Sequence, residues 1–256
     1  MKHDRAMERR GFLKGAVGTA SLLALAGCDN LTKSNWFPGI LRKTEKLTDL
    51  VQRAIVPANA MAKEYAEADI STAFPANGNT DPGTREYYER ARNDFENWNV
   101  RIDGLVTTPL IFSLAAIKEM PSRTQITRHD CVEGWSAIGK WTGVPLSDLM
   151  RRAQPRSNAR YAVFHCADVD DKGISYYESI ALADCYHPQT ILAYELNGSP
   201  LDVPHGAPLR LRFERQLGYK QAKYIERIEL VESLHGIGMG KGGYWEDQGY
   251  EWYAGI

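Results

Sequence analysis

Apolar residues between positions 47 and 55 recur with the three- to four-residue spacing of an amphipathic helix. Pro57 follows, and proline ends a helix because it has no backbone N–H to donate. The helix-prone sequence from Thr84 to Trp98 predicts a second helix. Between the two, residues 74–83 are rich in Pro, Gly, Asn and Asp, a composition typical of a loop.

From residue 100 onward the pattern changes to short apolar runs with β-branched and aromatic residues. Gly, Pro or Asn bounds each run, which favours strands joined by turns. The predicted strands cover residues 100–103, 160–164, 190–194, 209–213 and 225–231.

Two short helices are predicted among these strands. Ser113 is placed to cap the first, ahead of Leu114 and Ile117. The second has an apolar face formed by Leu146, Leu149, Met150 and Ala153. These elements predict an α+β fold with mixed and antiparallel sheets, preceded by a helical N-terminal arm.

The chain has 256 residues, of which 43% are hydrophobic, with 31 basic and 32 acidic side chains. This composition suits a globular protein and excludes a disordered chain or a multispan membrane protein. Basic groups exceed acidic ones in the first 27 residues, so the remainder carries about four net negative charges. Nucleic-acid binding is therefore not expected.

Arg9 and Arg10 precede an apolar run, residues 15–26, that is too short to cross a bilayer as a helix. The arginine pair resembles the twin-arginine signal, which exports folded proteins. The sequence from Leu25 to Cys28 resembles a lipobox, so Cys28 is expected to receive a lipid and anchor the mature chain. An ordinary signal peptide with an incidental cysteine is the alternative.

Cys131 follows a β-prone segment that breaks at Gly134, so its thiol is expected at a strand end facing a cleft. Arg128 and His129 precede it, and nearby positive charge favours the thiolate, which binds metals or attacks electrophiles. A buried, inert cysteine is the alternative, because free cysteine is among the most buried residue types.

Four motifs decide between these alternatives. They are Cys-Val-Glu-Gly-Trp-Ser from Cys131, Trp-Thr-Gly-Val-Pro-Leu from Trp141, Ala-Tyr-Glu-Leu-Asn-Gly from Ala193 and His-Gly-Ala-Pro-Leu-Arg from His205. Together they resemble the sulfite oxidase family of molybdopterin enzymes over residues 98–256. The chain's size and export signal are similar to the family's periplasmic methionine sulfoxide reductases, whereas its last two motifs are closer to sulfite oxidase itself.

The resemblance implies a sulfite-oxidase-type fold that holds the molybdenum cofactor, Mo-molybdopterin. Cys131 would be the single protein ligand of molybdenum. His205, Arg210 and Lys223 match positions that seat the pterin and its phosphate, and cationic donors suit a dianionic phosphate. Asn77 is a further candidate for cofactor contact. For Arg210, an exposed strand arginine is the alternative.

Arg128 and Arg215 could provide positive charge for a small anionic substrate, so Arg128 is a catalytic candidate. Cys166 stands where the sulfoxide reductases have threonine, and it is expected near the cofactor. Cys166 and Cys185 could pair in an oxidising compartment or stay as two free buried thiols.

Two other segments have candidate roles. The glycine- and aromatic-rich C-terminus predicts a wrapping segment that forms the rim of the active-site funnel, with Tyr244, Trp245 and Tyr250 as the residues to test. Asp168, Asp170 and Asp171 lack the remaining ligands of a calcium loop, so a solvated turn is expected there.

The resemblance implies an exported molybdenum-dependent oxidoreductase that transfers an oxygen atom to or from a small-molecule or peptidyl sulfur substrate. Sulfoxide reduction and sulfite-like oxidation both remain open. Because the chain encodes no haem or iron–sulfur ligands, a membrane b-type or soluble c-type cytochrome is expected to exchange its electrons. A non-catalytic, cofactor-binding envelope lipoprotein on the same fold is the alternative.

The predicted organisation has three segments. Residues 1–27 form the signal peptide, residues 28–97 form a lipid-anchored helical arm and linker, and residues 98–256 form the molybdopterin-binding catalytic domain. Asp29 after Cys28 resembles a retention signal, which indicates the periplasmic side of the bacterial inner membrane.

Overall fold

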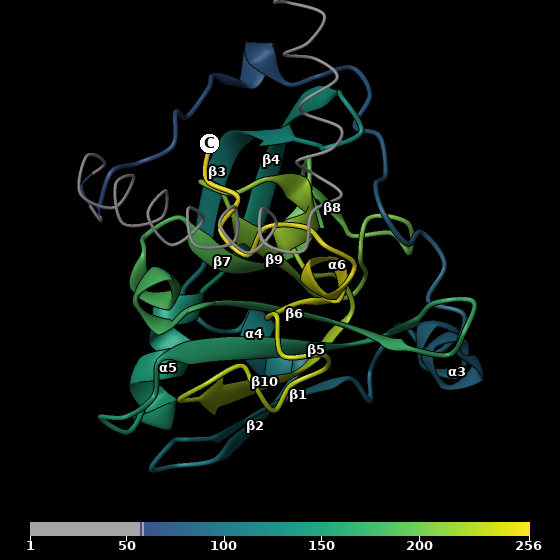
Figure 1. Ribbon diagram of the computed structural model, residues 1–256. Coiled ribbons are helices and arrows are strands. Elements are labelled where there is room, and N and C mark those ends of the chain that lie inside the picture. Colours follow the sequence, from purple (N-terminus) through teal and green to yellow (C-terminus); the bar gives the residue numbers. More distant parts are fainter. Residues whose placement is uncertain (1–56, 58) are drawn as a thin grey trace, which may run out of the picture. The chain divides into compact units, whose positions relative to one another are not determined.

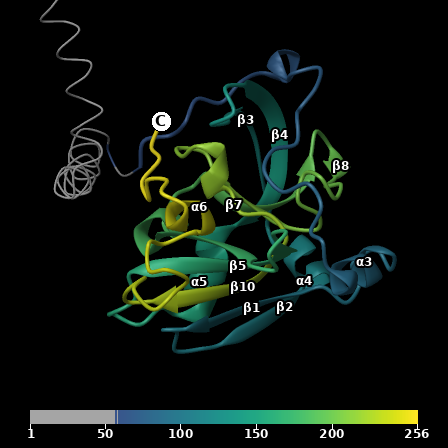
Figure 2. The same ribbon diagram turned by 45° about the vertical axis from the view of Figure 1, so that its right-hand side comes forward.

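The computed structural model describes residue 57 and residues 59–256. The helix predicted at residues 47–55 and the signals around Cys28 lie outside the described residues. Within the described part, two five-stranded sheets lie one above the other (Figure 1). The turned view shows the same two layers (Figure 2).

The first sheet is mixed and has the strand order β2-β1-β10-β5-β6. Strands β1 and β10 pair in parallel, and the other neighbours are antiparallel. The strands are β1 (Asn99–Gly104), β2 (Leu110–Ser113), β5 (Tyr161–Val169), β6 (Ser175–Ala181) and β10 (Ile225–Val231).

The second sheet is antiparallel and has the order β3-β4-β7-β8, with β9 also pairing with β7. Strands β3 and β4 form a long hairpin, and the turn between them contains Cys131. The strands are β3 (Arg123–Asp130), β4 (Ser136–Pro145), β7 (Thr190–Leu196), β8 (Ser199–Pro200) and β9 (Arg210–Phe213).

The described helices are short. They are α3 (Arg85–Ala91), α4 (Leu114–Lys118), α5 (Leu146–Ala153) and α6 (Tyr244–Asp247), with 3₁₀ turns at Glu67–Asp69, Leu182–Tyr186 and Gly218–Lys220. The predicted cap is confirmed, because Ser113 Oγ accepts a hydrogen bond from the Ala116 N–H. None of the described helices is long and apolar enough to cross a membrane.

The helix predicted from Thr84 to Trp98 is shorter than expected. Thr84 caps its start, but it ends at Ala91 and the chain reaches positive φ at Asp94 and Phe95. The turn lets the Trp98 indole enter the core, where it is fully buried and donates to the Ile225 carbonyl. Tertiary packing therefore overrides helix propensity here.

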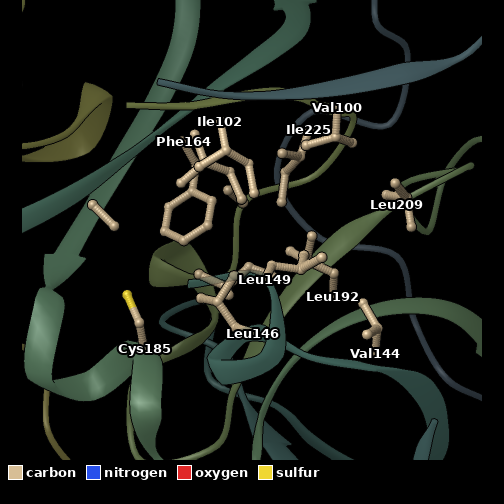
Figure 3. Close-up of a cluster of buried hydrophobic side chains, with 14 of the residues drawn as sticks. Val100, Ile102, Val144, Leu146, Leu149, Phe164, Cys185, Leu192, Leu209 and Ile225 are labelled. Atoms are coloured by element: carbon tan, nitrogen blue, oxygen red, sulfur yellow. The ribbon is translucent and has the colours of Figure 1, made fainter. Parts of the chain in front are cut away.

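The main core lies between the sheets, with residues of the first sheet facing α5 and the second sheet (Figure 3). Ile102 and Phe164 come from one layer, and Leu149 and Leu192 come from the opposite side. All four are fully buried, at about 1.5–3 kcal/mol of transfer free energy for each side chain. The predicted α+β fold with mixed and antiparallel sheets is confirmed.

The segment before α3 packs along the β3–β4 hairpin. The Tyr65 N–H donates to the Ile126 carbonyl, and the Ser71 N–H donates to the Ile138 carbonyl. The segment then continues to Asn77, so it supplies part of the site described below. The predicted boundary at residue 97 stays a prediction.

Candidate functional site

Cys131 stands at the first position of the turn between β3 and β4, as the sequence predicts. Its N–H donates to the Trp135 carbonyl, and its own carbonyl accepts from the Gly134 N–H. Gly134 has a φ of 90°, a conformation that suits glycine. Cys131 is 8% exposed and lines a pocket, so it faces a cleft at a strand end.

The Cys131 pocket has a volume of about 120 Å³. It brings together three of the predicted site residues, Asn77, Cys131 and Lys223, with Trp245 and Tyr250 of the C-terminal segment. The other lining residues are Gly78, Asn79, Val132, Glu133, Asp168, Tyr176, Gly218, Tyr219 and Gln221.

Lys223 organises one side of the pocket. Its Nζ donates to the carbonyls of Asn77 at 2.8 Å and Pro204 at 2.9 Å, and also to the carbonyl of Asn79. Burial and the nearby Arg210 guanidinium lower the pKa of Lys223 to about 7. The carboxylates of Asp168 and Asp202 act in the opposite direction but do not offset these two effects on the pKa.

Arg210, on β9, is 1% exposed, so the alternative of an exposed strand arginine is wrong. Its Nη1 donates to the His205 carbonyl at 2.9 Å, but Nε and Nη2 are buried without a hydrogen-bond partner. Burial, with the like charge of Arg212, lowers the pKa of Arg210 to about 9. We call Arg210, Arg212 and Lys223 the cationic cluster. Two unsatisfied guanidinium nitrogens in this cluster suit an anionic, oxygen-rich ligand.

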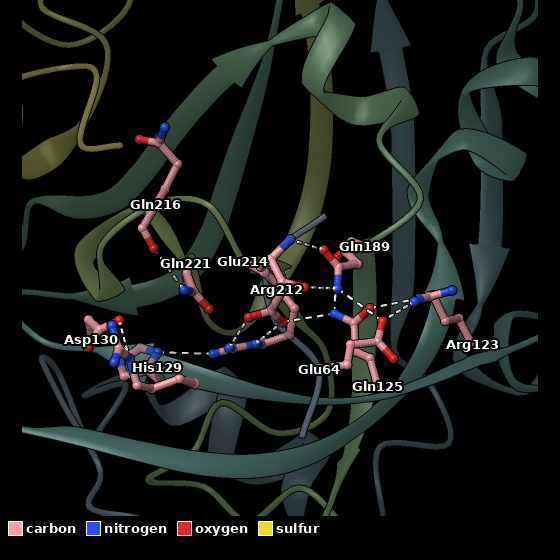
Figure 4. Close-up of polar contacts among 12 residues, drawn as sticks. Glu64, Arg123, Gln125, His129, Asp130, Gln189, Arg212, Glu214, Gln216 and Gln221 are labelled. Carbon is pink, nitrogen blue, oxygen red and sulfur yellow. Dashed lines mark hydrogen bonds and ion pairs between the residues drawn. The ribbon is translucent and has the colours of Figure 1, made fainter. Parts of the chain in front are cut away.

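A buried polar network links this cluster to the surface (Figure 4). The Arg212 guanidinium binds both Glu214 oxygens and approaches His129 Nδ1 at 3.0 Å. Glu214 also accepts from Gln125 Nε2 at 2.8 Å, and Gln125 accepts from Arg123 Nε at 2.8 Å. The network fixes the ring of the histidine that precedes Cys131 by two residues.

The expectation that Arg128 and His129 favour the thiolate is wrong. Burial, followed by repulsion from Arg212, lowers the pKa of His129 to about 2, so its ring is neutral. Burial raises the pKa of the Cys131 thiol, and the Glu133 carboxylate adds to the increase. Coordination to a metal ion, which deprotonates a bound thiol, would have to provide the thiolate instead.

Arg128 does not line the pocket, which corrects its predicted catalytic position. Side chains alternate along β3, so His129 is buried while Arg128 points to the other face. Its Nε pairs with Asp130 at 2.9 Å. Arg215 is also directed elsewhere, because its Nη1 donates to the carbonyls of Pro57 and Ala60.

His205 does not line the pocket either. Its Nε2 lies 2.9 Å from the Phe74 carbonyl oxygen and its Nδ1 lies 2.6 Å from Asp202 Oδ1, so both ring nitrogens are engaged. The backbone carbonyl of His205 accepts from Arg210. Arg210 does not line the pocket either, and the contact of His205 with the pterin stays a prediction.

Cys166 and Cys185 are both free and buried, so the expectation of a disulfide between them is wrong. Cys185 faces the main core (Figure 3). Cys166 lies two residues before Asp168 on the same buried face of β5. Burial raises the pKa of both thiols well above the usual range. Cys166 thus sits behind the wall of the pocket that Asp168 lines.

Asp168 is not part of a solvated turn, which corrects the sequence-based interpretation. It is 2% exposed, its Oδ2 accepts from Asn79 Nδ2 at 3.1 Å and its Oδ1 has no hydrogen-bond partner. Burial raises its pKa to about 6. Asp170 does form the turn, because its carboxylate accepts from the N–H groups of Lys172 and Ile174.

The opposite wall of the pocket rests on a buried ion-pair group. The Lys220 ammonium lies between the carboxylates of Glu178 and Glu246, and all three side chains are at most 2% exposed. We call these residues the wall triad. It joins β6, the 3₁₀ turn and α6, and so supports Tyr219 and Trp245. Sequence reasoning missed it because its members lie 26 and 42 residues apart.

Sequence reasoning also missed other residues that line the Cys131 pocket. Tyr176 donates to the Tyr219 carbonyl at 2.7 Å, and Gln221 Nε2 donates to the Gln216 carbonyl. Gly218 admits close approach, because an added Cβ would lie 2.5 Å from His129 Nε2. Burial alternates over the second half of β5, so the two-residue period of a strand is the signal that could have identified Asp168; β6 shows no such alternation that would have identified Tyr176.

Comparison with known proteins gives consistent matches. The family described as "Oxidoreductase molybdopterin binding domain" matches residues 88–236. The chain is 36% identical over 257 aligned residues to the putative protein-methionine-sulfoxide reductase subunit YedZ1 of Azospira oryzae, covering 99% of this chain and 90% of that protein.

Two further similarities cover about half of the chain. The protein-methionine-sulfoxide reductase catalytic subunit MsrP of Ralstonia nicotianae is 36% identical over 147 residues, which cover 53% of this chain and 44% of that protein. The crystal structure of the sulfane dehydrogenase SoxCD from Paracoccus pantotrophus aligns with a TM-score of 0.48 and 21% identity, over 54% of this chain and 39% of that chain. The chain thus spans less than half the length of MsrP.

Proposed function

Because the chain belongs to the molybdopterin-binding oxidoreductase family and is a molybdenum enzyme, we propose that it reduces sulfoxides, with methionine sulfoxide as the substrate class. The YedZ1 and MsrP relatives carry that activity in their names. Oxidation of a sulfite-like anion is the competing direction. The charges that line the Cys131 pocket favour one of these two reactions, as argued from the lining residues below.

The described residues fit the cofactor. Its phosphate and pterin are polar and anionic, and the Nε and Nη2 atoms of Arg210 are buried donors without a partner. Asn77 Oδ1 and Gln221 Oε1 are buried acceptors that likewise have no hydrogen-bond partner, and both residues line the pocket. Arg210 would hold the phosphate, Lys223 would add charge, and Asn77 with Gln221 would bind the pterin edge.

Cys131 would be the metal ligand, since it is the cysteine among the described residues that lines the pocket. When bound, the cofactor supplies a metal that exchanges an oxygen atom with the substrate. The turn that holds Cys131 keeps its sulfur in place, through hydrogen bonds at both its N–H and its carbonyl. The chain's own contribution here is therefore to position the Cys131 sulfur for the metal.

The charge of the pocket lining is the observation that favours sulfoxide reduction over oxidation of a sulfite-like anion. Lys223 is its cation and donates to three carbonyls, whereas Glu133 and Asp168 are carboxylates. Val132 and Tyr250, which are 45% and 42% exposed, give the pocket an apolar border. If the cofactor phosphate engages Lys223, the charged groups left in the lining are the carboxylates of Glu133 and Asp168. A neutral sulfoxide with an apolar arm suits that remaining lining better than a small dianionic substrate does.

Reduction of a sulfoxide to a thioether consumes two electrons and two protons and releases water. A membrane b-type or soluble c-type cytochrome would deliver the electrons. Export by the twin-arginine route, a lipid on Cys28 and a position on the periplasmic side of the inner membrane are parts of the same proposal. The mass of the mature N-terminus tests them, and unmodified Cys28 would remove the anchor.

The test of function uses natively exported holoenzyme. We expect about one molybdenum for each chain, oxidation of a reduced viologen dye that depends on methionine sulfoxide, and little reduction of ferricyanide by sulfite. Faster turnover with sulfite than with the sulfoxide would contradict the proposal. A chain without molybdenum would favour a non-catalytic envelope lipoprotein.

Cys131→Ser tests the ligand. We expect turnover to fall by more than about 100-fold, beyond the usual effect of losing an outer partner of a metal ligand. Most of the pterin should stay bound, because the cationic cluster is unchanged. Cys185→Ser is the matched control, since Cys185 is buried in the core away from the pocket. Full activity in Cys131→Ser would refute the assignment.

A further inference from the structure

We propose that a second pocket, next to the Cys131 pocket, binds a positively charged group of the substrate, such as a lysine or arginine side chain beside the sulfoxide. This inference rests on the proposed function and adds a substrate preference to it. The second pocket has a volume of about 490 Å³. Its lining consists of Asn79, Asp81, Gly83, Asp168, Val169, Asp170, Asp171, Ile174, Tyr176, Tyr244 and Trp245.

The charge of this lining is negative. It contains the carboxylates of Asp81, Asp168, Asp170 and Asp171, and none of the described lining residues is Lys, Arg or His. Lys172 follows Asp171 in the sequence but does not line the pocket. Four carboxylates around one space attract a cation and raise its local concentration.

Asp168 is the feature that points to a ligand. It is 2% exposed, it lines both pockets, and its Oδ1 has no hydrogen-bond partner. A buried carboxylate oxygen without a donor is costly, and a bound ammonium or guanidinium group would satisfy it. The other acids are more exposed, so they would act mainly through their charge.

Aromatic rings distinguish an organic cation from a metal ion. Tyr176 and Tyr244 lie 5.5 Å apart between ring centroids, and the Trp245 ring lies 5.3 Å from that of Tyr244. Such faces attract ammonium and guanidinium groups, and the aliphatic part of Lys or Arg packs on apolar surface such as Ile174. The described residues contain no group of three or more acidic, His or Cys ligands placed for a metal.

The two pockets are adjacent. Asn79, Asp168, Tyr176 and Trp245 line both of them. A peptide whose sulfoxide enters the Cys131 pocket would therefore place a neighbouring residue in the second pocket. The charge of that neighbouring residue would then affect how tightly the peptide binds, although the residue does not contact the reacting atoms.

The test compares three short peptides with blocked ends, each with one methionine sulfoxide flanked by Lys, Gln or Glu. With holoenzyme, we expect kcat/KM to fall in the order Lys, Gln, Glu, by about 2- to 5-fold for each unit of charge, as for exposed ion pairs. Added salt should reduce these ratios, because it screens exposed charges.

Asp171→Lys tests the residues, because Asp171 is exposed and its side chain caps no turn or helix in the described structure. We expect the preference for the Lys peptide to fall toward unity or to reverse. Glu119→Lys is the matched control, since Glu119 is exposed, lies after α4 and lines neither pocket. It makes the same change in net charge and should keep the preference.

The outcomes separate this inference from the function. Equal kcat/KM for the three peptides, with the Gln peptide reduced, would refute the subsite and leave sulfoxide reduction standing. Reduction of none of them would refute the function. In that case the same peptides, labelled with a dye and measured by fluorescence anisotropy on holoenzyme, still test the subsite, and equal affinities would refute it.

Discussion

Two groups of buried charges flank the Cys131 pocket, and they differ in how the charges are compensated. In the wall triad, Lys220 lies between two carboxylates and its pKa is raised by them. In the cationic cluster, Arg210 has one backbone carbonyl as a partner and its pKa is lowered to about 9. Both cations are at most 1% exposed, so burial does not explain the difference.

The contrast separates charges that hold the fold from charges that wait for a ligand. A buried cation with carboxylate partners stabilises the packing around it, and its removal leaves buried carboxylates behind. A buried cation without an anion costs stability until an anion binds. Binding of the phosphate then stabilises the folded chain by mass action. Arg212 is itself paired with Glu214, so the contrast applies to Arg210 and Lys223. Substitution of Lys220 and substitution of Arg210 should therefore have opposite consequences for the stability of the apoprotein.

The largest effect is expected for Lys220→Met in the wall triad. The change leaves Glu178 and Glu246 buried without their cation, so the free energy of unfolding should fall by about 3–5 kcal/mol. Denaturant titration of the apoprotein measures it. Lys140→Met is the control, because Lys140 pairs with the exposed Glu67 and should cost at most about 1 kcal/mol. Equal losses in the two variants would break the comparison.

Much of the fold could be predicted because its signals are local. The strand predicted at residues 225–231 has the limits of β10, since an apolar run between turns forms a strand wherever it packs. Ser113 and the apolar face from Leu146 to Ala153 likewise predicted α4 and α5. Strands β2, β4, β6 and β8 were not predicted. Strands β2 and β8 are short, polar residues or glycines interrupt β4 and β6, and all four depend on their neighbours in the sheet.

The site was predicted only where a residue is fixed by its own turn or strand. Cys131 lies at the strand end as expected, and Arg210 is buried on β9. The direction of Arg128, however, depends on the register of β3 with β4. The partner of His205 comes from Phe74, 131 residues away. Such long-range pairings determine the electrostatics, and no local pattern records them.

A second effect is expected for Arg210→Met in the cationic cluster. The bound cofactor should lose charged hydrogen bonds of about 1.5–3 kcal/mol, so its retention should weaken by about 10- to 150-fold. The unfolding free energy of the apoprotein should stay level or rise, because a buried, uncompensated charge is removed. Pterin content after dialysis and denaturant titration measure the two.

The control for this second prediction is Arg85→Met, which removes an exposed arginine that lines neither pocket. It should change neither pterin retention nor apoprotein stability by more than about 0.5 kcal/mol. If the apoprotein of Arg210→Met instead lost as much stability as Lys220→Met, Arg210 would be a structural cation and the contrast would disappear.

The smallest effect is a pH dependence of the unfolding free energy, which we expect from Lys223 but not from Lys220. The pKa of Lys223 is lowered to about 7, so between pH 7 and its ordinary value the unfolded chain binds more protons than the folded apoprotein. Stability conferred through Lys223 therefore rises with pH, by about 1 kcal/mol from pH 7 to 8. Lys220, with a raised pKa, stays protonated in this range and adds no such rise.

Denaturant titrations of wild-type and Lys223→Met apoprotein at pH 7 and 8 isolate this contribution, because all other titrating groups are common to both. The wild-type chain should gain about 1 kcal/mol relative to the variant over this interval. In the holoprotein, the bound phosphate should raise the pKa of Lys223 and flatten the difference. The same rise in apoprotein and holoprotein would mean that no anion reaches Lys223, and the cationic cluster would then need another explanation.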